Sequence, residues 1–131
     1  MKKTVQVVGA IIENENNEIL CALRSTNMTL PNCWEFPGGK VEKNEKVSDA
    51  IIREIKEELN CDIKFIDIFN NSSYEYEDII VNLTTIRCKI VGGCPIANEH
   101  DKLIWLDKKN LLSLNWAPAD IPTVNLLLKE K

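Results

Sequence analysis

Short apolar runs alternate with polar breaks in the N-terminal part of the chain. Thr4–Ile12 (TVQVVGAII) is rich in β-branched residues and predicts a strand. Asn14–Asn17 has the composition of a turn, and the apolar run Glu18–Arg24 follows it. We therefore expect the chain to begin with an antiparallel hairpin.

The pattern then changes to a helical period. Apolar residues recur every three or four positions from Val47 to Ile55, which predicts an amphipathic helix over Glu45–Leu59. Asn44 is the expected N-cap, and Asn60 is suited to a left-handed C-cap. We expect this helix to pack its apolar side against the sheet.

Strand patterns return in the second half of the chain. Ile63–Tyr76 and Ile79–Val91, separated by two acidic residues, predict a second antiparallel hairpin. Leu103–Leu106 is a short apolar strand, and Asp107–Leu114 is expected to start with a capped short helix. A last helix is expected after Pro122. This order of elements predicts an α/β fold.

Composition narrows the class of protein. A chain of 131 residues that is 44% hydrophobic and 27% charged predicts a single globular domain, residues 1–131. Its net charge of −4 argues against polynucleotide binding, although a small phosphorylated substrate can arrive with a metal ion. With no secretory leader and no apolar run long enough to cross a bilayer, we expect a cytoplasmic protein without a membrane partner.

Five cysteines form no CxxC pair, so we expect reduced thiols and no zinc site. Cys21 and Cys88 lie in apolar runs and are predicted core residues.

The predicted central helix carries an unusual cluster of charges. Arg53, Glu54, Glu57 and Glu58 fall within six residues. Glu54 and Glu58 interrupt the apolar side of the helix, and Glu57 projects nearby, because positions three and four apart are neighbours. Three crowded carboxylates repel one another and favour a bound cation. Mg²⁺ or Mn²⁺ prefers such oxygen ligands and keeps water and substrate phosphates as its other ligands.

This cluster belongs to a longer motif. Gly39 is followed after five residues by Glu45 and after seven more by Arg53-Glu54-Ile55-Lys56-Glu57-Glu58, a spacing that resembles the Nudix box. One position departs from the family pattern, since Asn60 stands where the family usually has glycine. The resemblance implies the Nudix fold, an α/β/α sandwich around a mixed central β-sheet.

The resemblance also implies the roles of the acidic residues. A divalent metal ion would be held by Glu54, Glu57, Glu58 and the backbone carbonyl of Gly38. The general base varies within the family, so we name Glu54 first and Glu99 second. Glu99 matches a glutamate in the loop before the Trp-containing strand of MutT-like members, and its alternative is a solvated loop residue.

Four further residues complete the expected catalytic centre and its phosphate contacts. Arg53 and Glu45 are expected to pair, orienting the loop and the acidic helix beside the metal. Arg24 is either a solvated strand end or, by resemblance to MutT-like members, a phosphate clamp. Lys40, after the Pro-Gly-Gly bend, is assigned to substrate binding. His100, the sole histidine, is weak evidence for catalysis.

Two aromatic residues and one acidic residue are expected where the nucleobase would bind. We expect Phe36 to line a nucleobase pocket with Trp34 packed beneath it. Asp120 is either the N-cap of the last helix or a base reader, because the run APADIP resembles bacterial CTP pyrophosphohydrolases.

Together these features predict a Mg²⁺-dependent nucleoside triphosphate pyrophosphohydrolase, monomeric or homodimeric, of the MutT-like group. Cytidine nucleotides and oxidised nucleotides such as 8-oxo-dGTP are the favoured substrates. The alternatives are a Nudix hydrolase of another nucleoside diphosphate derivative, such as ADP-ribose or a dinucleoside polyphosphate, and a non-catalytic nucleotide-binding module.

Overall fold

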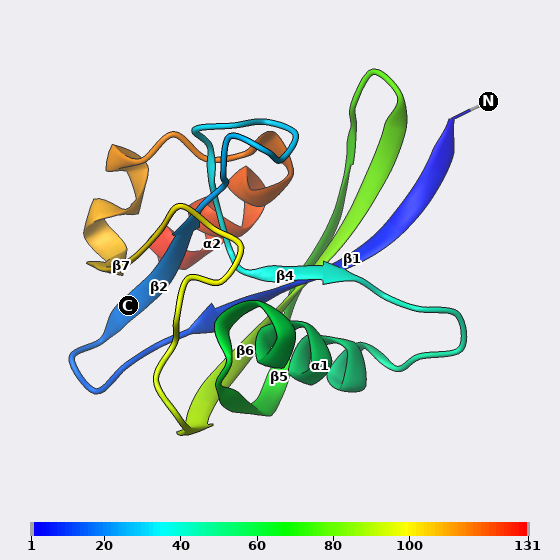
Figure 1. Ribbon diagram of the computed structural model, residues 1–131. Helices are drawn as coiled ribbons and strands as arrows, with labels where there is room; N and C mark the ends of the chain where they lie inside the picture. The colour runs from blue at the N-terminus through cyan, green and yellow to red at the C-terminus, as the bar shows by residue number, and fades with distance from the viewer. Residues whose placement is uncertain (1, 131) are drawn as a thin grey trace.

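The computed structural model describes residues 2–130, so Met1 and Lys131 of the predicted 1–131 domain lie outside the described residues. Within this range the elements follow one another as shown in Figure 1. The strands are β1 (Lys3–Ile12), β2 (Glu18–Leu23), β3 (Trp34–Glu35), β4 (Gly38–Lys40), β5 (Asp62–Glu75), β6 (Ile79–Gly92) and β7 (Lys102–Asp107). The helices are α1 (Val47–Leu59), η1 (Lys108–Ser113), η2 (Pro118–Asp120) and α2 (Ile121–Lys129).

The strands form two sheets. A four-stranded sheet has the order β4-β1-β6-β5, in which β1 and β6 are parallel and both outer strands are antiparallel to their neighbours. A three-stranded sheet has the order β3-β2-β7. The larger sheet is therefore the mixed sheet that was expected.

Helices pack on both faces of β1. Ala10 and Ile12 lie in one hydrophobic core with Ile51 and Ile55 of α1, whereas Ile11 lies in a second core with Val124 of α2. Alternate residues of a strand point to opposite faces of its sheet. The predicted α/β/α sandwich is thus confirmed.

The predicted N-terminal hairpin is wrong in its pairing. β1 and β2 are joined only by an isolated bridge between Glu13 and Ile19, and they belong to different sheets. β6 pairs along the whole length of β1, and β4 with the carbonyl of Pro37 occupies the other edge of β1. Because both edges of β1 are taken, β2 pairs with β3 and β7 instead.

The second predicted hairpin is confirmed, because β5 and β6 pair in antiparallel fashion over most of their length. Cys21 and Cys88 are buried, as expected for core residues.

The predicted start of the central helix is wrong. α1 begins at Val47 rather than at residue 45, and Lys46 occupies the N-cap position. Asn44 does not cap the helix, because its φ of 64° places it in a left-handed turn. The Glu45 side chain accepts the backbone N–H of Glu42 and so holds this segment as a loop. At the other end Asn60 is left-handed, with φ 53°, as expected.

The C-terminal region starts with 3₁₀ turns. Asp107 precedes η1 but makes no side-chain cap, so the predicted capped helix is replaced by an uncapped 3₁₀ helix. α2 packs Val124 and Leu127 into the core, with Leu128 partly buried beside them. Among residues 2–130, the helices are all too short or too polar to span a membrane.

Candidate active site

The acidic end of the site is built by the C-terminal half of α1. Glu58 is buried, Glu54 is half-buried and Glu57 is exposed. The Glu58 carboxylate accepts the backbone N–H of Gly38 at 3.1 Å. Burial, followed by the charges of nearby carboxylates, raises the pKa of Glu58 to about 9. Burial also raises the pKa of Glu54. A cation at this place would relieve the repulsion.

Arg53 joins the loop before α1 to these carboxylates. Its guanidinium contacts both carboxylate oxygens of Glu45 at 2.9 Å and donates to Glu54 at 2.9 Å. It also donates to the backbone carbonyl of Lys40 at 3.0 Å. The structure thus brings the expected Arg53–Glu45 pair together, and the hydrogen bond with Arg53 lowers the pKa of Glu45 to about 2. This pair fixes β4 relative to the acidic helix.

The two glycines of β4 are required by close approach rather than by unusual dihedral angles. A side chain on Gly38 would collide with the backbone carbonyl of Val8 in β1. A side chain on Gly39 would collide with the Glu54 carboxylate. Glycine therefore lets the strand lie directly against the acidic face of α1.

The oxygen donors fit a hard divalent cation that shares its coordination with the substrate. No group of three His, Cys, Asp or Glu side chains within residues 2–130 is arranged to enclose a metal ion by itself. Mg²⁺ is commonly held by one or two carboxylates and completes its octahedron with water and phosphate oxygens. Glu54 and Glu58 lie on the buried side of this cluster, and Glu57, which is 3.5 Å from Arg53, lies on its exposed side.

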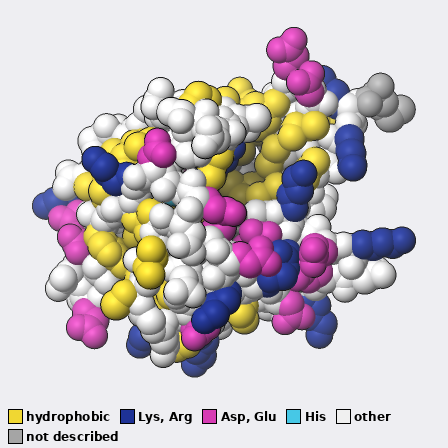
Figure 2. Space-filling view, in the orientation of Figure 1, with side chains coloured by type: hydrophobic (Ala, Val, Ile, Leu, Met, Phe, Trp, Pro, Cys, Tyr) yellow, Lys and Arg dark blue, Asp and Glu magenta, His cyan; other side chains and the backbone are white. Residues whose placement is uncertain are grey.

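A cavity of about 830 Å³ opens beside this acidic end. Figure 2 shows acidic side chains gathered beside a hollow with a hydrophobic floor. Its size suits a small organic ligand with several polar groups. The wall near α1 includes Gly38, Gly39 and Glu58, with the exposed Lys40 on the same strand. The apolar floor comes mainly from β1 and β6, namely Val5, Val7, Ile79, Val81 and Leu83.

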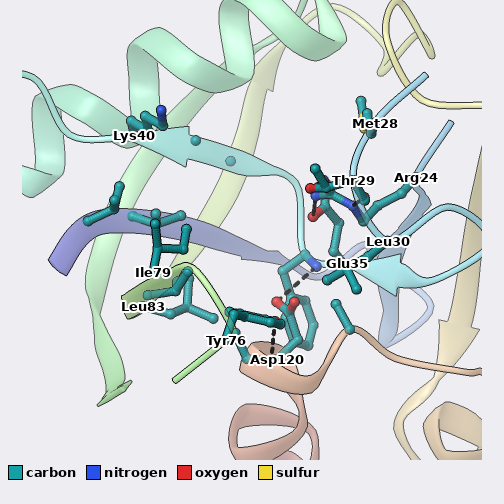
Figure 3. Close-up of a pocket in the computed structure, with 18 of the residues that line it drawn as sticks. Arg24, Met28, Thr29, Leu30, Glu35, Lys40, Tyr76, Ile79, Leu83 and Asp120 are labelled. Carbon is teal, nitrogen blue, oxygen red and sulfur yellow. Dashed lines mark hydrogen bonds and ion pairs between the residues drawn. The ribbon is translucent and has the colours of Figure 1, made fainter. Parts of the chain in front are cut away.

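The far end of the cavity is aromatic and acidic. Phe36 is buried and stacks on Trp116, with ring centroids 4.8 Å apart. Trp116, which the sequence analysis did not assign, therefore supports Phe36, while Trp34 packs at the edge of the same core. Asp120 and Tyr76 lie next to one another in Figure 3.

Asp120 is buried and stands at the N-cap position of α2, as one alternative predicted, but its side chain makes no capping hydrogen bond there. Its carboxylate lies 3.5 Å from the backbone nitrogen of Phe36, which points toward it. Burial, followed by the charge of Glu35, raises the pKa of Asp120 well above its usual range. Asp120 thus presents a buried carboxyl group at the cavity wall, in surroundings that disfavour its charged form.

Arg24 is not a solvated strand end. Its side chain is 19% exposed and lines the cavity. The guanidinium donates to Glu35 at 2.6 Å, to the Thr29 carbonyl at 2.6 Å and to the Thr29 hydroxyl at 3.0 Å. Arginine has five N–H donors, so two remain for a ligand.

The loop before β7 approaches the site from the other side. Glu99 is exposed, and its charge contributes to the raised pKa values of Glu54 and Glu58, which places it near the acidic end. His100 is buried and contacts Glu35 at 2.8 Å.

Glu35 was not among the residues predicted from the sequence, and His100 was not expected to contact it. A charged residue between two aromatic residues, just before a Pro-Gly-Gly bend, was the available signal for Glu35. No sequence pattern indicated that the two residues meet, because they are 65 positions apart.

Comparison with known proteins agrees with this geometry. The chain is 33% identical over 126 residues to the CTP pyrophosphohydrolase of Escherichia coli (strain K12), covering 96% of this chain and 93% of that protein. It is 31% identical over 122 residues to the 8-oxo-dGTP diphosphatase of the same strain, covering 93% and 95%. A solution structure of a MutT protein from methicillin-resistant Staphylococcus aureus 252 has a TM-score of 0.81 and 52% identity over the whole of both chains.

The model of the NUDIX domain matches residues 3–127. That range contains both ends of the cavity and all the residues that line it. The protein therefore belongs to the Nudix hydrolase family.

Proposed function

We propose that this Nudix hydrolase is a Mg²⁺-dependent nucleoside triphosphate pyrophosphohydrolase, which converts a nucleoside triphosphate and water into the monophosphate and diphosphate. The observation that carries the proposal is one continuous cavity with an acidic, glycine-lined end and an aromatic end. A nucleotide has the matching polarity, with phosphates that need a metal at one end and a flat base at the other. The family resemblance implies attack of water at the β-phosphorus, and we adopt this in the proposal.

The catalytic end is assigned to α1 and β4. Bound Mg²⁺ would polarise the phosphate oxygens and lower the pKa of a water molecule. The proposed ligands are Glu54, Glu57, Glu58 and the carbonyl of Gly38. Glu54 is the first candidate for accepting the proton of the attacking water, and Glu99 is the second. Glu45 acts on the centre through Arg53, whose hydrogen bond holds Glu54 in place.

The substrate end is assigned to residues that line the rest of the cavity. Arg24 offers its two remaining donors, and Lys40 its ammonium, to phosphate oxygens. Phe36 provides an aromatic surface for the base. A protonated Asp120 would donate one hydrogen bond and accept another along the base edge.

Two groups of substrates follow from this assignment. Cytosine presents an amino donor beside a ring acceptor, which complements a carboxylic acid, so (d)CTP and its modified forms are favoured. Oxidised nucleotides such as 8-oxo-dGTP are the second group. The relatives named above support both, one being a CTP pyrophosphohydrolase and the other an 8-oxo-dGTP diphosphatase.

The alternatives have less support. ADP-ribose or a dinucleoside polyphosphate would need a grip for a second large group, and we assign no residues to one. A non-catalytic module is disfavoured because all four glutamates of the box are present. The net charge of −4 favours free nucleotides over polynucleotides as substrates. We place the enzyme in the cytoplasm, as a monomer or homodimer.

The test is release of diphosphate from a panel that contains CTP, 5-methyl-dCTP, 8-oxo-dGTP and ADP-ribose, each with Mg²⁺ and with excess EDTA. We expect Mg²⁺-dependent turnover of at least one nucleoside triphosphate. The matched variant Glu57→Gln should abolish that turnover and keep the melting temperature, since Glu57 is exposed. Hydrolysis of ADP-ribose with none of the triphosphates turned over would overturn the substrate class.

A further inference from the structure

The starting observation is a chain of polar contacts that crosses three separate segments. His100 contacts one carboxylate oxygen of Glu35 at 2.8 Å, and Arg24 donates to the other at 2.6 Å. Arg24 in turn holds both the carbonyl and the hydroxyl of Thr29. Figure 3 shows Arg24, Thr29 and Glu35 gathered at one side of the cavity. The contacts therefore join the loop after β2, strand β3 and the loop that carries Glu99.

Glu35 occupies the centre of this chain and lies near two other acidic residues, Glu58 and Asp120. Its charge raises the pKa of Glu58 at the acidic end and of Asp120 at the base end of the cavity. Substrate phosphates bound in the cavity would repel this carboxylate. Both of its oxygens must then be held by donors if it is to keep one orientation. Arg24 and His100 are those two donors.

His100 has the environment of a residue kept for position rather than for folding. Its side chain is 0% exposed, and Nε2 must carry the proton to donate to the Glu35 carboxylate. The other ring nitrogen, Nδ1, has no hydrogen-bond partner among the described residues. A buried polar atom without a partner is unfavourable for stability, so the polar contribution of the imidazole comes from the contact of Nε2 with Glu35.

The backbone supports the same connection. The N–H of Asp101, next to His100, donates to the Leu23 carbonyl at 3.0 Å, immediately before Arg24. The N–H of Arg24 donates to the Cys33 carbonyl at 2.9 Å. The loop that carries Glu99 and the loop that carries Thr29 thus share one anchoring point at the end of β2.

We propose that His100 is a positioning residue, which fixes the Glu35 carboxylate and through it the Arg24 guanidinium, so that the substrate-binding loop and the Glu99 loop keep one relative arrangement. The catalytic part of this inference rests on the proposed function. We therefore expect loss of the imidazole to act through Arg24. It should weaken substrate binding more than it lowers the stability of the protein.

The first test compares His100→Leu with His100→Gln. Leucine fills the space without a donor, so we expect on the order of a tenfold loss of kcat/KM, mainly through a higher KM. Glutamine carries an amide N–H within similar reach of Glu35 and should restore most of the loss. As a matched control, Thr123→Val removes another buried hydrogen bond, that between Thr123 and Thr85 at 3.0 Å, away from the cavity lining.

We expect Thr123→Val to lower the melting temperature at least as much as His100→Leu does and to leave kcat/KM unchanged. If the role of His100 were purely structural, His100→Leu would lower the melting temperature more than Thr123→Val does, or His100→Gln would not restore kcat/KM. Either result overturns the proposal.

The second test asks whether the effect passes through Arg24. In an Arg24→Ala background, adding His100→Leu should change kcat/KM little further, because residues that act in one network are not additive. A full additional loss in the double variant would show that His100 acts by another route, and would overturn the proposal.

A third measurement does not depend on activity. Amide hydrogen exchange at Arg24 and Asp101 should become faster in His100→Leu and remain near wild type in His100→Gln. If the wild-type protein hydrolysed none of the nucleotides, the proposed function would fail, while this measurement would still decide the positioning role. Unchanged exchange at both amides in His100→Leu would overturn it.

Discussion

The Glu54 carboxylate fills the space directly above Gly39, where any other residue would carry its side chain. This contact couples the glycine of β4 to the candidate general base, so Gly39→Ala should displace Glu54 without disturbing the hydrophobic core. A displacement of about 1 Å at a reacting group costs roughly 100-fold in rate, and we expect a loss of kcat of that order. Steady-state diphosphate release, with circular dichroism to confirm folding, measures it.

Gly38→Ala provides the contrasting control. Here the new methyl group would meet the backbone carbonyl of Val8, which belongs to the β1–β4 ladder and cannot rotate away. We expect a loss of about 1–3 kcal/mol in the free energy of unfolding, as for other overpacked sites. If Gly39→Ala destabilised the protein as much as Gly38→Ala while kcat was retained, the interpretation of the Gly39 contact would be wrong.

The Glu45–Arg53 pair predicts how the stability of the protein depends on pH in the acid range. The hydrogen bond from Arg53 lowers the pKa of Glu45 to about 2, below the value of 4.5 for a free glutamate. A group with a depressed folded pKa stabilises the protein above its unfolded pKa and loses that contribution as the pH falls. We therefore expect stability from this pair to decline between about pH 4.5 and pH 2.

Carbon-detected NMR titration of the Glu45 carboxyl group measures this pKa. In Arg53→Gln it should return toward the usual glutamate range. Arg87→Gln is the matched control, because Arg87 contacts Asp67 and Glu130 instead. A midpoint near 4.5 in the wild type would contradict the pairing.

Glu58 predicts proton release when a metal binds. Burial and neighbouring carboxylates raise its pKa to about 9, so the metal-free protein holds this side chain protonated at pH 7. Metal ligands must be deprotonated, and binding of Mg²⁺ should release about one proton. Affinity for Mg²⁺ should accordingly increase as the pH approaches 9.

Titration calorimetry in buffers of different ionisation enthalpy counts that proton. Glu58→Gln should abolish the release of the proton. Glu57→Gln should weaken Mg²⁺ binding but preserve the proton release, since Glu57 is exposed. Mg²⁺ affinity should increase with pH, whereas the stability of the metal-free protein should decrease with pH, because the raised pKa of Glu58 favours the protonated form in the folded state. Its stabilisation is complete at low pH and is lost as the pH rises through about 9. Buffer-independent heats at pH 7 would refute the assignment of Glu58.

Trp116 should contribute to the stability of the protein at the aromatic end of the cavity. Its indole N–H donates to the Leu111 carbonyl at 2.7 Å, and its ring supports Phe36. Trp116→Phe keeps an aromatic ring but removes one of two donors to the Leu111 carbonyl, which still accepts the backbone N–H of Leu114 at 3.2 Å. We expect the lost hydrogen bond to cost about 0.5–1.5 kcal/mol in the free energy of unfolding. Urea unfolding measures this cost. Trp105→Phe, at a half-buried position, should cost less, and equal losses would argue against the role of the hydrogen bond.

The linear sequence predicted much of the proposed catalytic end because that end is local. Glu54, Glu57 and Glu58 share one helix, and helical periodicity places them near one another wherever the helix packs. The spacing from Gly39 to Arg53 predicted the adjacent loop for the same reason, and the structure brings Arg53, Glu45 and Glu54 together. The misplaced helix start shows the limit, since Glu45 is held outside the helix by its side-chain contacts.

Tertiary structure decided what depends on pairing between distant segments. β2 leaves β1 because the edges of β1 are already occupied, which no local pattern of apolar residues reveals. The contact of His100 with Glu35, and the stacking of Phe36 on Trp116, join segments far apart in the chain. Local periodicity encodes which face of an element is apolar, whereas the partner of that face is selected by burial and hydrogen bonding across the whole fold.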